Sequence, residues 1–153
     1  MKFILAALLA LGVASASVAQ TASPLPGTLT VTSAKPFAVF LDALLDSIGA
    51  NKMGLVAHAC ADCGAKAIGV KIPGNRVVMA FHPRYAVRML KANVAAGIEA
   101  PIRLYVTERA DGSATLTYRT PSAVFAPYKT PDLDVMAREL DGVFKKIVAD
   151  ALR

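Results

Sequence analysis

The sequence predicts an α+β fold: a two-layer sandwich in which a mixed sheet of about five strands carries helices mainly on one face. Two long segments repeat apolar residues every three or four positions, as one face of a helix does. Between them lie short segments that alternate apolar and polar residues or are continuously apolar, which is typical of strands. The expected order is β-α-β-α-β-α-β-β-α, and packing helices on a sheet buries the apolar faces of such a chain.

The early part of the chain predicts one strand and one long helix. Residues 28–32 alternate threonine with leucine and valine, which favours a strand. Pro36 opens the helix, and Gly49 stands where a C-cap glycine belongs. The apolar residues of this helix recur with the spacing of a single helix face: Phe37, Phe40, Leu41, Leu44, Leu45 and Ile48.

The middle of the chain predicts two apolar strands joined by a short helix. The strands cover residues 53–57 and 76–81, and the helix covers residues 60–68. A further helix runs from Pro83, a residue suited to the first helical position, to Gly97. If the two apolar strands run parallel, they end at the same edge of the sheet.

The C-terminal part predicts a hairpin, an irregular stretch and a long helix. Asp111-Gly112 is a hairpin turn signal between strands at residues 102–108 and 114–118. Residues 121–131 are expected to be irregular, and the last helix begins after Thr130 as its N-cap. Its continuous apolar stripe consists of Leu133, Met136, Ala137, Leu140, Phe144, Ile147, Val148 and Ala151.

Residues 1–19 have the pattern of a signal peptide. A positive charge precedes the apolar residues 3–13, and Ser17-Val18-Ala19 fits a small-x-small cleavage site. The apolar run is shorter than the roughly 20 residues that a bilayer span needs. We therefore expect Sec-dependent export to the periplasm or the medium, without a membrane span after cleavage. Residues 20–27 then form a leader, and residues 28–153 form a single domain.

The charges of the chain are modestly basic and dispersed. The chain has 17 Lys and Arg against 11 Asp and Glu, a formal net charge of +6. A nucleic-acid interface typically clusters basic residues and interleaves them with aromatic residues. The basic residues of this chain form no such cluster. The glycine spacing matches no dinucleotide-binding or phosphate-binding loop. We therefore expect no nucleic-acid partner.

The two cysteines, Cys60 and Cys63, form a Cys-x-x-Cys motif shortly after His58. In an oxidising compartment two cysteines are most often paired, so a Cys60–Cys63 disulfide is expected. A thiolate at a helix N-terminus is stabilised and reactive, which makes the pair a candidate for redox chemistry. The alternative is a structural disulfide, which stabilises little because it closes a very short loop.

A metal site is another interpretation of the same motif. His58, Cys60, Cys63 and His82 have side chains that suit zinc or copper. They gather at one rim of the sheet if the two apolar strands of the middle part run parallel. A single Cys-x-x-Cys pair is a weak zinc signature, and c-type haem is excluded because Gly64, not histidine, follows the second cysteine.

Outside this motif the sequence offers few candidate functional residues. Glu108 and Tyr118 stand on the two arms of the predicted hairpin and are candidates to face one cleft. No Ser/His/Asp order or pair of carboxylates marks a hydrolytic site. The sequence thus favours a non-enzymatic binding or accessory module, binding a metal or a small molecule, with its cleft near His58, His82 and the cysteines. The alternative is a periplasmic thiol–disulfide redox protein, and a third interpretation is homodimerisation through an exposed sheet edge.

Several short motifs are spread over residues 28–128. They are Leu44-Leu45-Asp46-Ser47-Ile48-Gly49, the strand into His58, Ala65-Lys66-Ala67-Ile68-Gly69, Val78-Met79-Ala80-Phe81-His82-Pro83, Ala100-Pro101-Ile102-Arg103-Leu104-Tyr105-Val106-Thr107-Glu108 and Thr117-Tyr118-Arg119-Thr120-Pro121. In order and spacing they resemble the domain-of-unknown-function 302 family of small bacterial domains. The resemblance implies a compact α+β domain and no established activity. Cys60 and Cys63 depart from the common pattern of that family, so the function of this chain can differ from that of relatives without them.

Overall fold

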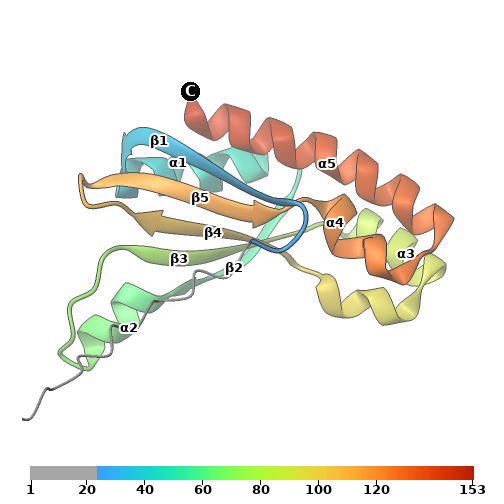
Figure 1. Ribbon diagram of the computed structural model, residues 1–153, viewed down its shortest axis with the longest axis horizontal. Helices are drawn as coiled ribbons and strands as arrows, with labels where there is room; N and C mark the ends of the chain where they lie inside the picture. Colours follow the sequence, from blue (N-terminus) through green and yellow to red (C-terminus); the bar gives the residue numbers. More distant parts are fainter. Residues whose placement is uncertain (1–23) are drawn as a thin grey trace, which may run out of the picture.

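The computed structural model describes residues 24–153. The predicted signal peptide, residues 1–19, therefore lies outside the described residues. So do residues 20–23, the first four residues of the predicted leader (residues 20–27). The described chain forms a five-stranded sheet with a layer of helices (Figure 1). This arrangement confirms the predicted α+β class. In the described part, no helix combines the length and the apolar character that a membrane span requires.

The helices and strands match most of the predicted elements. In chain order they are β1 (Thr28–Pro36), α1 (Phe37–Ala50), β2 (Gly54–Cys60), α2 (Ala61–Ala67), β3 (Asn75–Phe81), α3 (Pro83–Ala92), the 3-10 helix η1 (Val94–Glu99), β4 (Ile102–Glu108), β5 (Ser113–Arg119), α4 (Pro121–Phe125), the 3-10 helix η2 (Ala126–Tyr128) and α5 (Pro131–Leu152). α1 continues past the predicted C-cap Gly49 and ends with Asn51 as its C-cap.

Two stretches differ from the predicted elements. The helix predicted from Pro83 to Gly97 is divided into α3 and η1, because Asn93 is extended and its side chain accepts a hydrogen bond from the Ala95 N–H. The stretch 121–131, predicted to be irregular, contains α4 and η2. α4 forms because the Thr120 side chain caps its N-terminus, a preference that short helices share with long ones.

The order of strands in the sheet is β1-β5-β4-β3-β2, and every neighbouring pair is antiparallel. The sheet is therefore antiparallel rather than mixed, and β2 and β3 do not run parallel. A parallel crossover needs a connection that packs back over the sheet, usually a helix. α2 buries none of its residues and lies beyond the end of the strands (Figure 1), so the chain returns beside β2.

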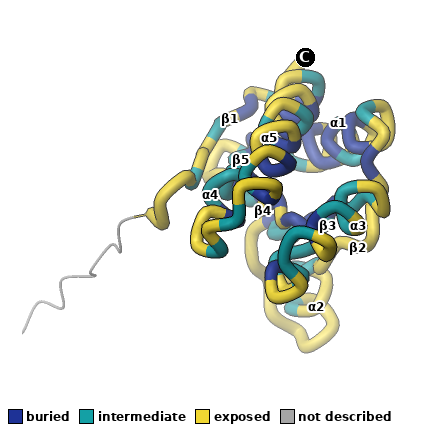
Figure 2. The backbone as a smooth tube through the Cα atoms, turned by 90° about the vertical axis from the view of Figure 1, so that its right-hand side faces the viewer, coloured by how far each residue is buried: buried dark blue, intermediate teal, exposed yellow. Residues whose placement is uncertain are grey.

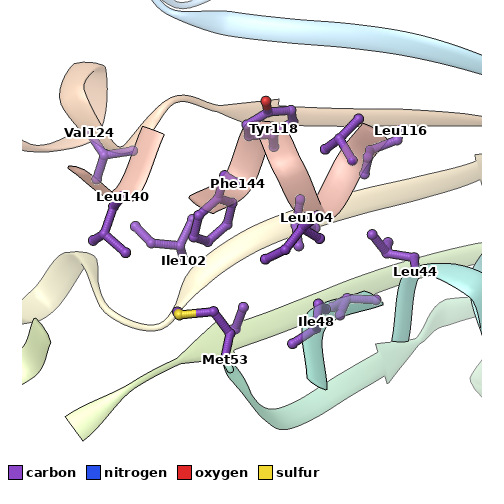
Figure 3. Packing of buried hydrophobic residues seen from close by; sticks show 14 of the residues in the cluster. Leu44, Ile48, Met53, Ile102, Leu104, Leu116, Tyr118, Val124, Leu140 and Phe144 are labelled. Carbon is purple, nitrogen blue, oxygen red and sulfur yellow. The ribbon is translucent and has the colours of Figure 1, made fainter. Parts of the chain in front are cut away.

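One face of the sheet forms the core together with α1 and α5. On β4, Ile102, Leu104 and Val106 alternate with exposed residues, and their buried side chains face the helices. Leu44 and Ile48 of α1 and Leu140 and Phe144 of α5 pack against this face (Figure 3). Each of these four side chains is at most 3% exposed. The helices thus lie mainly on one face, as the sequence predicts.

The edge strand β2 is the least covered strand of the sheet. All of residues 54–59 are exposed, whereas the central strands β3, β4 and β5 each contain buried residues (Figure 2). The β2–β3 ladder has two ends that matter for function. Cys60 lies opposite Arg76 at one end, and Gly54 lies opposite Phe81 at the other.

Candidate functional site

Cys60 and Cys63 form a disulfide at the junction of β2 and α2. Cys60 is the last residue of β2 and the N-cap of α2, and its Sγ accepts a hydrogen bond from the Cys63 N–H at 3.0 Å. Cys60 is half-buried, whereas Cys63 is exposed. Cys63 is therefore the more accessible of the two cysteines.

Asp62 connects this junction to the neighbouring strand β3. Its carboxylate forms an ion pair with Arg76, and its Oδ1 accepts a hydrogen bond from the Asn75 N–H at 3.0 Å. The same oxygen lies 3.7 Å from Cys60 Sγ. The side chains of Arg76 and Asp62 are 14% and 24% exposed, so water screens their charges only in part. A carboxylate and a guanidinium thus act together on any charge that develops at Cys60.

α2 and the loop to β3, residues 61–74, form a lobe that projects beyond the end of the sheet (Figure 1). α2 buries no residue, and the loop exposes Ile68, Val70 and Ile72. The lobe is held to the sheet by the disulfide, by the Asp62–Arg76 ion pair and by hydrogen bonds at Asn75 and Gly74, rather than by a core of its own. Its base can therefore be approached by a second protein.

His58 lies near the disulfide but outside its immediate cluster. It is exposed on β2, two positions before Cys60, so the two side chains point to the same face of the sheet. Within residues 24–153, the group of potential metal ligands whose atoms lie within 4.8 Å of one another here consists of Cys60, Asp62 and Cys63. The cysteine sulfurs of this group are free to bind a metal only after reduction.

His82 lies at the opposite end of the β2–β3 ladder from the cysteines. Because β2 and β3 are antiparallel, the predicted gathering of His58, Cys60, Cys63 and His82 at one rim does not occur. His82 lies six positions after Arg76, the partner of Cys60, which in an extended strand corresponds to about 20 Å. His82 instead caps α3, since its Nδ1 accepts a hydrogen bond from the Arg84 N–H at 3.1 Å.

A small cavity lies beside His82, between the end of the sheet, α3 and α5. Its volume is about 30 Å³. The residues that line it are Met53, Ala80, Phe81, His82, Tyr85, Ala86, Met89, Ala100, Ile102, Phe125, Met136 and Leu140. Met53 and Ile102 appear in Figure 3, and both belong to this lining. The lining contains no carboxylate, lysine or arginine, so the cavity is apolar apart from the histidine and tyrosine at its margin.

Glu108 and Tyr118 do not share a cleft. Tyr118 is only 6% exposed and stacks on the Phe144 ring, with ring centroids 6.2 Å apart. Burial, and to a lesser extent the negative charge of Asp141, raise the pKa of Tyr118, which therefore stays protonated in the core. Glu108 instead accepts a hydrogen bond from the Gly74 N–H through its Oε2 at 2.7 Å. It thus holds the end of the 61–74 lobe against β4.

Gly74, the partner of Glu108, has a steric reason to be glycine. A Cβ at this position would lie 2.5 Å from the Phe37 ring. The Arg76 guanidinium lies over the same ring, 5.7 Å from its centroid. This close packing fixes where the lobe leaves the sheet, and it places Arg76 where it meets Asp62.

Two features of these sites were missed by sequence reasoning. Asp62 stands inside the Cys-x-x-Cys motif, so its position was a usable signal for a charge next to the disulfide. The cavity has no local signal, because its three methionines, Met53, Met89 and Met136, come from three separate parts of the chain. Only the packing of these parts brings them together.

Comparison with known proteins places the fold in a family. The sequence profile described as "Domain of unknown function DUF302" matches residues 29–151. The crystal structure of an uncharacterized conserved DUF302 protein from Bacillus stearothermophilus is similar, with a TM-score of 0.73 and 17% sequence identity. The similarity covers 84% of this chain and 99% of that chain. At this identity the likeness shows the fold alone. A search of curated proteins finds no match.

Proposed function

This chain belongs to the DUF302 family, whose name assigns no activity, and from its own residues we propose an exported accessory domain that exchanges its disulfide with a partner thiol. One observation carries the proposal: the Cys60–Cys63 bond lies at the surface, with Cys63 exposed and no buried residue in the helix α2 that follows. A disulfide with a purely structural role does not need to be exposed. Accessible disulfides are the ones that exchange readily.

The proposed exchange begins at the more exposed sulfur. A partner thiolate attacks Cys63 Sγ, the Cys60–Cys63 bond breaks, and a mixed disulfide forms while Cys60 leaves as a thiolate. The Cys63 N–H, which already donates to Cys60 Sγ, stabilises the negative charge of this leaving group. A second partner thiolate then attacks the partner's own sulfur in the mixed disulfide and releases Cys63 as a thiolate. Two electrons pass from the partner dithiol to the pair, and the partner becomes a disulfide.

The charges around Cys60 favour its release as a thiolate. Asp62 alone would repel a thiolate, but the Arg76 guanidinium pairs with the carboxylate and balances its charge. The site is therefore close to neutral before the exchange and gains one negative charge at Cys60. Because Arg76 neutralises the Asp62 carboxylate, that carboxylate does not oppose the negative charge that forms on Cys60 Sγ.

A thiol count on protein purified from the periplasm, with metal analysis of the same sample, tests the proposal. We expect no free thiol and no bound zinc in the isolated protein, and two free thiols after a mild reductant acts on the folded protein. A pair that resists reduction until the protein is denatured would contradict the proposal, because the disulfide would then be structural. Two free thiols with one equivalent of zinc or copper would favour the metal site described next.

The second candidate function is metal binding by the reduced pair. It rests on the group Cys60, Asp62 and Cys63, whose ligand atoms lie within 4.8 Å of one another, with His58 nearby on the same face. Thiolate, carboxylate and imidazole ligands suit zinc, and copper is the alternative. This candidate expects stoichiometric zinc uptake by the reduced protein that is lost in Cys60→Ser and weakened in His58→Ala. His82→Asn is the matched control, since His82 lies at the other end of the ladder and should leave uptake unchanged.

We also propose export to the periplasm, on the basis of residues 1–19, and homodimerisation through the edge strand β2. Residues 54–59 are exposed and contain no Lys, Arg, Asp or Glu, so a second copy can pair with this edge without charge repulsion. Sedimentation velocity tests this part. A dimer that dissociates in Ala57→Lys supports it, and a monomer at all concentrations contradicts it.

A further inference from the structure

We propose that the cavity beside His82 binds a single soft monovalent metal ion, Cu(I) or its analogue Ag(I), through the thioether sulfurs of Met53, Met89 and Met136. This site lies at the end of the β2–β3 ladder opposite the cysteines. The inference does not rest on disulfide exchange, and it holds whether or not Cys60 and Cys63 react.

The methionines of the chain converge on this cavity. The chain has five methionines, and Met1 precedes the described residues. Three of the other four line the cavity, and they are nearly fully buried, with Met53 at 6%, Met89 at 4% and Met136 at 1% exposure. They come from the turn before β2, from α3 and from α5, so the cavity brings together methionines from three separate parts of the chain. A metal ion held by side chains needs such an arrangement.

The volume of the cavity selects an ion over an organic molecule. A void needs at least about 10–15 Å³ of accessible volume to hold one particle the size of a water molecule. The cavity has about 30 Å³, enough for one or two particles of that size. Water is a poor occupant, because it requires two to four hydrogen-bonding partners and stays out of apolar voids.

The chemistry of the lining selects a soft ion of low charge. Calcium, magnesium and manganese take oxygen ligands, and the cavity offers no carboxylate. Thioether sulfur is a neutral, polarizable ligand that selects Cu(I) among the biological metals. A single positive charge among neutral ligands also costs less desolvation than a double charge does.

Ligation is assigned to the three sulfurs and not to His82. The His82 Nδ1 is occupied as acceptor from the Arg84 N–H. His82 and Tyr85, both half-buried, lie edge to face with ring centroids 5.9 Å apart at the margin of the cavity. These two rings form the boundary between the sulfurs and the solvent, and they are where an ion would enter.

The test uses Ag(I), which does not change oxidation state, and protein that carries Cys60→Ser and Cys63→Ser so that thiols cannot compete. The methionine methyl groups are labelled with 13C and followed by NMR during the titration, with assignment by single Met→Leu variants. We expect the resonances of Met53, Met89 and Met136 to shift together and to saturate at one equivalent. The resonance of Met79, on the other face of β3, should not move.

Affinity measurements on Met→Leu variants complete the test, since leucine keeps the volume but removes the sulfur. Met89→Leu and Met136→Leu should each weaken Ag(I) and Cu(I) binding at least tenfold, whereas the matched control Met79→Leu should bind as the parent protein does. The proposal is overturned if the three resonances do not shift at one equivalent, if Met79 shifts with them, or if the cavity variants bind as tightly as the control. In that case the methionines only fill the core.

Discussion

The two ends of the β2–β3 ladder contrast in how their sites are built. At one end, the site consists of sequence neighbours that are half-buried or exposed: Cys60, Asp62 and Cys63. Asp62 forms an ion pair with Arg76. At the other end, the cavity is lined by side chains from distant segments, and none of them is a carboxylate, lysine or arginine. The disulfide at the first end can be reduced without disturbing the fold, whereas the cavity at the second end is part of the core. This difference predicts how each end responds to mutation.

The largest expected difference is in stability. Met136→Ala removes a side chain that is 1% exposed, and such substitutions cost about 2–5 kcal/mol of unfolding free energy. The double variant Cys60→Ser, Cys63→Ser opens a very short loop and should cost less than about 2 kcal/mol. Urea unfolding of both variants measures the difference. A cysteine variant as unstable as Met136→Ala would contradict the contrast between the ends.

The charges at the cysteine end should tune the reduction potential in opposite directions. Asp62→Asn removes the repulsion and leaves Arg76 to stabilise the Cys60 thiolate, so the reduced form is favoured and the potential rises. Arg76→Gln leaves Asp62 unbalanced, so the potential falls. We expect each shift to be about 30 mV, a tenfold change in the exchange equilibrium.

Equilibration with glutathione buffers measures these potentials, and Arg84→Gln, at the other end of the ladder, is the matched control that should leave the potential unchanged. Shifts of equal sign in Asp62→Asn and Arg76→Gln would show that the ion pair does not act on Cys60 through its charge.

The two histidines should differ in how much their substitution lowers the stability of the fold. His82→Ala removes the N-cap of α3 and should cost about 0.5–2 kcal/mol. His82→Asn should recover most of this loss, because asparagine is a favourable N-cap. His58 is exposed on the edge strand, so His58→Ala should change stability by less than about 0.5 kcal/mol. Thermal unfolding of the three variants compares them, and an equal loss in both alanine variants would contradict the assigned cap.

The smallest expected effect concerns the exposed Arg88–Glu139 pair, which joins α3 to α5 near the cavity. The hydrogen bond and the charge of Arg88 lower the pKa of Glu139 below its ordinary value of 4.5. A carboxylate whose folded-state pKa is lowered stabilises the fold above its ordinary pKa, and this contribution is lost as the pH falls through the lowered value.

Glu139→Gln should therefore reduce the melting temperature slightly at neutral pH, and the difference from the parent should vanish in acid and shrink in high salt. Melting curves at several pH values and salt concentrations measure it. A difference that grows as the pH falls below 4.5 would contradict the sign of the pKa shift.

Sequence reasoning succeeded where neighbours in the sequence carry the signal. The apolar stripes of residues 37–48 and 133–151 predicted the two core helices, and Asp111-Gly112 predicted the hairpin between β4 and β5. The Cys-x-x-Cys motif likewise predicted the disulfide. In each case periodicity, turn chemistry or a motif is a property of a few consecutive residues.

The errors that concern the candidate site came from contacts between distant residues. The direction of β3 relative to β2 depends on whether residues 61–74 pack over the sheet, and no local pattern reports that they do not. The predicted gathering of His82 with His58, Cys60 and Cys63 at one rim depended on that direction and does not occur. Tyr118 is a predicted cleft candidate because it and Glu108 stand on the two arms of the hairpin, but the packing of α5 on the sheet places its side chain in the core.

The central claim is that the Cys60–Cys63 pair is a working redox site. Its reduction potential in the folded protein, measured by equilibration with thiol–disulfide buffers, tests this claim most directly. The account predicts a potential less negative than about −300 mV, the range of accessible and exchanging disulfides. A potential more negative than about −300 mV would contradict it, because the bond would then be a structural one that cellular thiols do not reduce.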